Sequence, residues 1–189
     1  LWWDGAVWFT DIKQKKIHRF DPATGAQKSW PAPSETGFLA PRKCGHFIAG
    51  TKTGLMDFDP ASGRFAPLRE VEPQRPANRL NDGAVDRQGR LWFGSMDDDE
   101  QRATGRLYCL DRGGLTPMDC GYVITNGPAF SPDGRVLYHT DTLARRIYAF
   151  DLGQGGALGN KRVFVEIENG AGYPDGSTVD SEGCLWTGL

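Results

Sequence analysis

The sequence predicts an all-β fold of the β-propeller class, and three observations lead to that prediction. Turn formers are abundant, with 25 glycines and 12 prolines among 189 residues. They are interleaved with the aromatic and β-branched residues that favour strands. A polar turn that ends in glycine recurs roughly every 40–50 residues, and each interval holds about four strand-like segments. Four strands in a repeat of that length are typical of a propeller blade.

The turn glycines place the strands of each repeat. These glycines are Gly5, Gly45, Gly89, Gly134 and Gly183. Short apolar strands are expected after the first four, at residues 6–9, 46–49, 91–94 and 136–139. A third strand then leads into a second turn, which reads Asp21-Pro22-Ala23-Thr24-Gly25 in the first copy, and a fourth strand follows. One twisted sheet cannot cover both of its apolar faces, so such sheets should stack around a channel.

The repeat units are expected at residues 1–36, 37–80, 81–125, 126–174 and 175–189, within a single domain. The first unit starts inside its first turn, and the last stops after its second strand. Propellers close by pairing their ends, because an open blade leaves bare strand edges. We therefore expect a partial propeller of about four blades and the start of a fifth, truncated at both ends, with no helix longer than about two turns.

Composition excludes several classes of protein. The net charge is −2 and no basic block occurs, so nucleic-acid binding is disfavoured. No apolar run approaches the roughly 20 residues of a membrane helix. No signal peptide opens the chain, although residue 1 is Leu rather than Met. Nothing indicates an obligate protein partner.

The four cysteines lack the CxxC spacing of a zinc site; they are Cys44, Cys109, Cys120 and Cys184. We interpret them as reduced, mostly buried thiols of a cytoplasmic protein.

A carboxamide or a carboxylate stands eight residues before each of the last three turn glycines: Asn81, Asn126 and Asp175. If the first strand of each blade lines the channel, these side chains converge near one mouth. Their oxygens are hard ligands that suit Ca²⁺, Mg²⁺ or Mn²⁺. Arg79 lies two residues before Asn81, on the same face of a strand. Its guanidinium can bind an anionic or carbonyl oxygen through two parallel hydrogen bonds.

Alternative interpretations of these residues exist. Asn-Gly and Asp-Gly pairs are also ordinary turn sequences. However, Gly134 and Gly183 already close the hairpins, which leaves the upstream Asn or Asp unexplained. A Ser–His–Asp triad is unsupported, because Ser95, Ser131 and Ser177 lack a nucleophile-elbow context. His139 either faces the channel or is a satisfied structural histidine.

The ordered set of motifs resembles the gluconolactonase, regucalcin (senescence marker protein) and luciferin-regenerating-enzyme-like family along essentially the whole chain. The motifs are Asp11-Ile12 followed by Ile17-His18-Arg19-Phe20-Asp21-Pro22, then Arg79-Leu80-Asn81-Asp82-Gly83, Thr125-Asn126-Gly127, Tyr138-His139-Thr140-Asp141 and Tyr173-Pro174-Asp175-Gly176. The resemblance implies a six-bladed propeller. It also implies metal-dependent hydrolysis of sugar lactones, aldonolactones such as gluconolactone, to the open-chain aldonic acid.

The resemblance also implies roles for individual residues. Asn126 and Asp175 match the metal-binding Asn and Asp, with Asp175 as the catalytic residue. Asn81 and Arg79 match the substrate-binding Asn and Arg. The family's metal-binding Glu is expected just before Leu1, because Leu1-Trp2 resembles the tail of its motif. One divalent cation is implied, which could be Ca, Zn, Mn, Mg or Fe.

Several points stay open at the level of sequence. Either Glu100 or Gln101 could match a further family Glu near the substrate. A non-catalytic propeller that binds calcium or another protein would use the same ring of oxygens. A quinone-dependent sugar dehydrogenase should carry a basic axial pocket, whereas only Arg79 occurs at the right phase. As a fragment without its Glu, the chain is expected to bind metal weakly, to self-associate and to be impaired as a lactonase.

Overall fold

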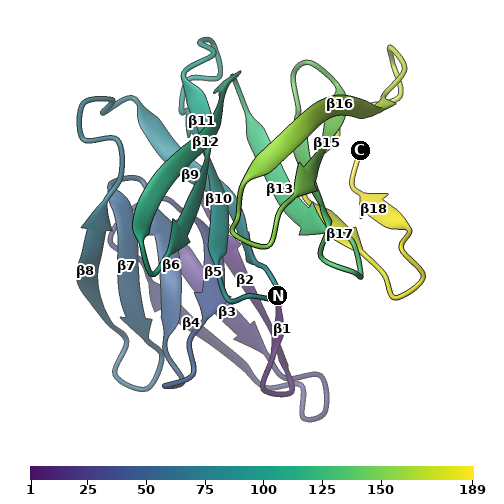
Figure 1. Ribbon diagram of the computed structural model, residues 1–189. Coiled ribbons are helices and arrows are strands. Elements are labelled where there is room, and N and C mark those ends of the chain that lie inside the picture. The colour runs from purple at the N-terminus through teal and green to yellow at the C-terminus, as the bar shows by residue number, and fades with distance from the viewer. The chain divides into compact units, whose positions relative to one another are not determined.

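The computed structural model describes residues 1–189 and consists of strands and turns without any helix (Figure 1). No helix long and apolar enough to cross a membrane is therefore present. The chain divides into two compact units, Leu1–Asn81 and Asp82–Leu189. The all-β prediction is confirmed, and each unit is described in turn.

The first unit contains two four-stranded antiparallel sheets, each with its strands in chain order. The first sheet comprises β1 (Trp2–Trp3), β2 (Ala6–Asp11), β3 (Lys16–Phe20) and β4 (Gln27–Pro31). The second comprises β5 (Thr36–Pro41), β6 (Phe47–Thr51), β7 (Gly54–Asp59) and β8 (Arg64–Glu70). The expected strands at residues 6–9 and 46–49 are present within one or two residues as β2 and β6.

Aromatic residues fill the core between these two sheets. Trp8 of β2 stacks on Trp30 of β4, with ring centroids 5.4 Å apart, and contacts Phe47 of β6 at 4.6 Å. Alternation along β2 explains the arrangement, because Ala6 and Trp8 are buried while Val7 and Phe9 are not. Buried aromatic pairs of this kind add about 0.5–1.5 kcal/mol each beyond the burial of their area.

The second unit holds two further four-stranded sheets and a two-stranded one. The first sheet comprises β9 (Asn78–Val85), of which Asp82–Val85 belong to this unit, β10 (Leu91–Asp97), β11 (Gly105–Asp111) and β12 (Gly114–Tyr122). The next comprises β13 (Thr125–Phe130), β14 (Val136–Asp141), β15 (Arg146–Leu152) and β16 (Leu158–Glu166). The last pairs β17 (Ser177–Val179) with β18 (Leu185–Thr187). Trp92, Leu107, Cys109, Leu137, Phe150 and Leu152 form this unit's core.

The turn before β10 shows why the repeat motif recurs. Gly89 has φ +80°, a conformation that favours glycine. The Asp86 carboxylate accepts hydrogen bonds from the backbone of Gln88 and Arg90, from Arg90 Nε at 2.5 Å and from Trp92 Nε1 at 2.8 Å. Asp180 repeats this arrangement before β18, where it accepts from Trp186 Nε1 at 2.8 Å. The aspartate, glycine and tryptophan of the motif thus form one hydrogen-bonded hairpin.

Some expectations about burial are wrong. All four cysteines are free, but only Cys109 is buried, since the other three lie at exposed turns or strand ends. Burial also differs between copies of the repeated motif, since Trp186 follows its turn like Trp8 and Trp92 but is 63% exposed. The reason is that β18 belongs to a two-stranded sheet. His139 is fully buried, yet neither ring nitrogen has a hydrogen-bond partner, so it is not a satisfied histidine.

Candidate functional site

Asn126 lies in β13 directly before a β-bulge. The pairing with β14 is regular at Asn126 and resumes at Ala129, so Gly127 and Pro128 form the irregular step. Gly127 has φ +74°, which other residues rarely adopt. The Asn126 side chain is buried, and its Nδ2 donates to Thr142 Oγ1 at 2.8 Å. Bulges re-aim side chains beside active sites. The bond to Thr142 distinguishes the amide nitrogen of Asn126 from its oxygen, and the oxygen is the atom type that suits a hard cation.

Thr142 connects Asn126 to the segment that carries Asp175. Its hydroxyl accepts from Asn126 and donates to the Pro174 carbonyl oxygen at 2.8 Å. The backbone of Asp175 is held on its other side, since its N–H donates to Gly188 O at 3.0 Å. The Asp175 side chain is exposed, ahead of β17. The second unit therefore brings together the two segments that bear the predicted metal ligands, Asn126 and Asp175.

Asp82 is a third member of this group, and sequence reasoning did not select it. The strand β9 continues to Val85, so Asp82 stands within a strand rather than in a turn. Its Oδ1 accepts from Gly83 N at 2.8 Å and its Oδ2 from Gly127 N at 2.9 Å. A Cβ atom added at Gly176 would lie 3.5 Å from the same Oδ2. The carboxylate thus lies between the residue after Asn126 and the residue after Asp175.

The surroundings of Asp82 disfavour its charge. Although Asp82 keeps some exposed surface, its carboxyl group lies among protein atoms. Burial raises the pKa of Asp82 to about 6, the negative charge of Asp175 adds to the rise, and the two backbone N–H donors oppose it. The sequence carries no signal for Asp82, because Asn-Asp-Gly is an ordinary turn sequence. Only the structure places Asp82 inside β9, where a charged group needs dedicated partners.

Arg79 and Asn81 lie in the part of β9 that belongs to the first unit. Arg79 is 6% exposed, and its Nη1 donates to Asn81 Oδ1 at 2.6 Å. This contact agrees with the prediction that both side chains share a face. Residue 37 of β5 has to be glycine because the backbone of β9 lies directly against it. A Cβ atom at Gly37 would be 2.0 Å from Asn81 O. Convergence of Arg79 and Asn81 with Asn126 and Asp175 stays a prediction.

The loop after β10 is organised by Asp97, whose side chain is fully buried. Its carboxylate accepts from Gln101 N and Arg102 N, both at 3.0 Å, and pairs with the Arg102 guanidinium at 2.8 Å. Glu100 and Gln101 are exposed on this loop. Gln101 Nε2 donates to Asp99 O at 3.2 Å. A substrate role for Glu100 or Gln101 stays open.

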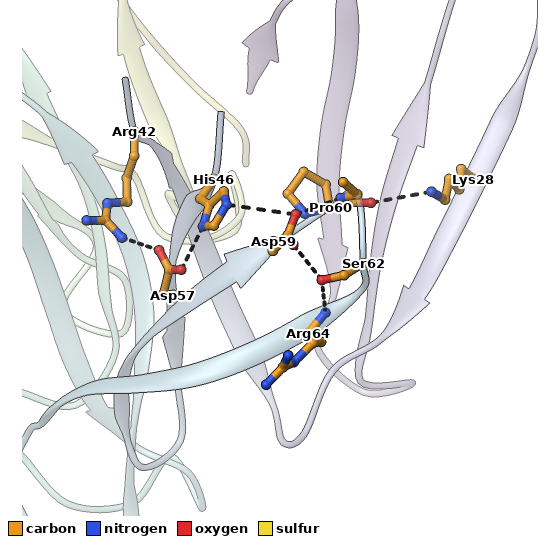
Figure 2. Close-up of polar contacts among 9 residues, drawn as sticks. Lys28, Arg42, His46, Asp57, Asp59, Pro60, Ser62 and Arg64 are labelled. Carbon is orange, nitrogen blue, oxygen red and sulfur yellow. Dashed lines mark hydrogen bonds and ion pairs between the residues drawn. The ribbon is translucent and has the colours of Figure 1, made fainter. Parts of the chain in front are cut away.

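A second polar cluster lies in the first unit (Figure 2). His46 stands between two aspartates, with Nδ1 2.7 Å from Asp57 Oδ2 and Nε2 3.9 Å from Asp59 Oδ1. Burial would raise the pKa of Asp57, but hydrogen bonds from His46 and Arg42 outweigh it and hold that pKa below its usual value. Asp59 also accepts from Ala61 N and Ser62 Oγ, which closes the turn after β7. These contacts explain why the polar residues cluster here: they stabilise the turn after β7.

No group of three or more His, Cys, Asp or Glu side chains is arranged to hold a metal ion. The predicted ligands, the side-chain amide oxygen of Asn126 and the Asp175 carboxylate, include only one residue of these four types and stay a prediction. The donor chemistry fits a hard cation, because both are oxygen ligands. The electrostatics fit as well, since the Asp82 carboxyl is desolvated beside the Asp175 charge and a cation would relieve that repulsion.

Comparison with known protein families matches residues 1–189 to the SMP-30/gluconolactonase/LRE-like region. The chain belongs to this family. The resemblance inferred from the ordered motifs is thereby confirmed.

Two members of the SMP-30/gluconolactonase/LRE-like family illustrate the similarity. The L-arabinolactonase of Azospirillum brasilense is 35% identical over 190 residues, a match covering 96% of this chain and 62% of the relative. The 6-deoxy-6-sulfogluconolactonase of Pseudomonas putida is 33% identical over 183 residues, covering 96% of this chain and 63% of the relative. The chain thus spans less than two thirds of the length of these relatives.

A solved structure of the family supports the fold. Regucalcin from Agrobacterium tumefaciens, described as a calcium-binding protein, superposes with a TM-score of 0.92 at 30% identity. The match covers 97% of this chain and 63% of that one. Together with the four-stranded antiparallel sheets, this similarity confirms the predicted fold class, an all-β partial propeller.

Proposed function

We propose that the protein hydrolyses a sugar lactone to the open-chain aldonic acid with the help of one divalent cation. The observation that carries the proposal is the shared hydroxyl of Thr142, which ties Asn126 to the Asp175 segment. The substrate class is supported by the two relatives, which are named for the lactones of L-arabinose and 6-deoxy-6-sulfogluconate.

We assign Asn126 and Asp175 to the cation. When bound, a divalent cation supplies Lewis acidity toward the ester carbonyl and acidifies water. The exposed Asp175 carboxylate acts as the general base that takes a proton from the attacking water. A lactone is an activated ester, so the chain needs no covalent nucleophile.

Arg79 and Asn81 are assigned to the substrate. The guanidinium can hydrogen-bond to two oxygens of a sugar acid at once. Its bond to Asn81 Oδ1 at 2.6 Å holds both side chains in one orientation before a sugar arrives. Such preorganisation lowers the entropic cost of orienting the lactone.

The second candidate function is non-catalytic calcium binding or protein interaction. It is favoured by the description of the Agrobacterium tumefaciens relative as a calcium-binding protein. Calcium is accordingly the first cation to test, ahead of Zn, Mn, Mg and Fe. We also propose a cytoplasmic location, since all four cysteines are unpaired and thiols persist in a reducing compartment.

The test is a pH-drop assay with several aldonolactones and a panel of divalent cations. We expect turnover that depends on added cation, loss of turnover in Asp175→Ala and weaker cation binding in Asn126→Ala. Glu182→Ala is the control, because Glu182 is an exposed turn residue of the same unit. Undiminished turnover in Asp175→Ala would refute the assignment. Cation binding without turnover of any lactone would favour the calcium-binding alternative.

A further inference from the structure

Asp82 is a partly exposed residue whose carboxyl group is desolvated, and its partners are unusual. Buried carboxylates are ordinarily paired with Arg or Lys, because an uncompensated buried charge is costly. The hydrogen-bond partners of Asp82 are the backbone N–H groups of Gly83 and Gly127, and its neighbour Asp175 carries the same charge. Desolvation and the like charge of Asp175 both disfavour the charged form of Asp82. Such an arrangement is typical of a site where stability is given up for function.

The contacts of Asp82 reach both segments that carry the proposed cation ligands. Its Oδ2 accepts a hydrogen bond from the N–H of Gly127 at 2.9 Å, inside the bulge that follows Asn126. The same oxygen lies against Gly176, where a Cβ atom would be 3.5 Å away. Since Gly127 adopts φ +74°, its conformation is not the default of an extended strand. The hydrogen bond from Gly127 to Asp82 is thus made in the bulged conformation that directly follows Asn126.

We propose that Asp82 is a positioning residue that holds the Asn126–Gly127 bulge against the Asp175–Gly176 segment and thereby sets the geometry of the cation ligands. This inference rests on the proposed function. Asp82 acts through the backbone of Gly127 rather than by touching substrate. Partners that orient metal ligands typically change metal affinity by 10–100-fold when they are removed.

The first experiment measures cation affinity by calorimetric titration of the protein with Ca²⁺ and Mn²⁺. Asp82→Ala removes both acceptor oxygens, and we expect its affinity to fall about 10–100-fold. Asp82→Asn keeps one carbonyl oxygen that can face Gly127, so it should recover part of the affinity. With lactone, kcat should fall in the same order while KM changes little, because the substrate contacts remain.

Asp86→Asn is the matched control. Asp86 is a buried aspartate of the same unit, 6% exposed, which accepts hydrogen bonds from Arg90 and Trp92. This variant should unfold at a lower temperature but bind cations unchanged at temperatures where it is folded. A purely structural role for Asp82 would give the same pattern as Asp86→Asn, and that result would overturn the proposal.

The second experiment reads the bulge directly through amide hydrogen exchange at Gly127, without cation or lactone. We expect Gly127 to be protected in the wild type, exposed to exchange in Asp82→Ala and partly protected in Asp82→Asn. Unchanged protection in Asp82→Ala, or a wild type that binds neither Ca²⁺ nor Mn²⁺, would overturn the proposal. Absence of lactone turnover with intact cation binding would instead remove the proposed function and leave the role of Asp82 standing.

Discussion

The buried histidine of β14 allows a quantitative prediction about stability and pH. His139 is fully buried, its ring meets Tyr122 edge-to-face at 4.8 Å, and neither ring nitrogen has a hydrogen-bond partner. Burial lowers the pKa of His139 from 6.5 to about 3, because the imidazolium cannot be solvated there. The folded state therefore keeps this ring neutral at pH values where the unfolded chain binds a proton.

The sign and size of the effect follow from proton linkage. Below pH 6.5 the unfolded state binds more protons, so stability is fully present above that pH and falls as the pH decreases toward 3. Each pH unit is worth about 1.4 kcal/mol, which amounts to about 2 kcal/mol at pH 5 relative to pH 7.5. For a chain of this size, that corresponds to roughly 4–8 °C in the unfolding midpoint.

The assay is urea unfolding of the wild type and of His139→Leu at pH 7.5 and pH 5. Leucine does not titrate, so the stability of the variant relative to the wild type should rise by about 2 kcal/mol on acidification. The contributions of the titratable groups that the wild type and the variant share cancel in this difference. His139→Gln is the control, since it is polar but does not titrate and should show the same pH trend. Equal changes in wild type and both variants between the two pH values would refute the reasoning.

Three further predictions concern packing, hairpin stability and the substrate. Gly37→Ala should lower the free energy of unfolding in urea by about 1–3 kcal/mol, because the new Cβ atom would lie 2.0 Å from Asn81 O. Gly155→Ala is the control, since nothing lies within 4 Å of a Cβ atom there, and it should change the free energy of unfolding by no more than about 0.5 kcal/mol. Asp86→Asn should cost about 3–5 kcal/mol, measured the same way, because it breaks a buried ion pair; a loss below 1 kcal/mol would contradict that. Arg79→Lys should raise the KM for lactone while the cation affinity measured by calorimetry stays constant. Lysine keeps the positive charge but loses the planar guanidinium that donates two parallel hydrogen bonds. An unchanged KM would exclude Arg79 from the substrate site.

The positions of strands and turns were predictable because they depend on neighbouring residues. Asp86, Gly89 and Trp92 form their hydrogen bonds within one hairpin, so the motif carries its own structure wherever it occurs. The recurrence of that motif gave the repeat, and the repeat gave the fold class. The same phase selected Asn126 and Asp175, whose segments the second unit brings together through Thr142.

Properties that depend on contacts between distant residues were not predictable. Asp82 and Gly127 are 45 residues apart in the chain, and nothing in the sequence Asn81-Asp82-Gly83 distinguishes a strand with a buried carboxylate from a turn. Trp186 has the local motif of Trp92 but not its burial, because burial depends on which sheet packs against the strand. His139 likewise occupies an ordinary position in the alternating pattern of its strand, and only its packing against Tyr122 shows that its ring is excluded from solvent. Local sequence thus determined the hairpins and the candidate ligands, whereas tertiary packing decided which of the polar groups lost their solvent and therefore which of them have unusual chemistry.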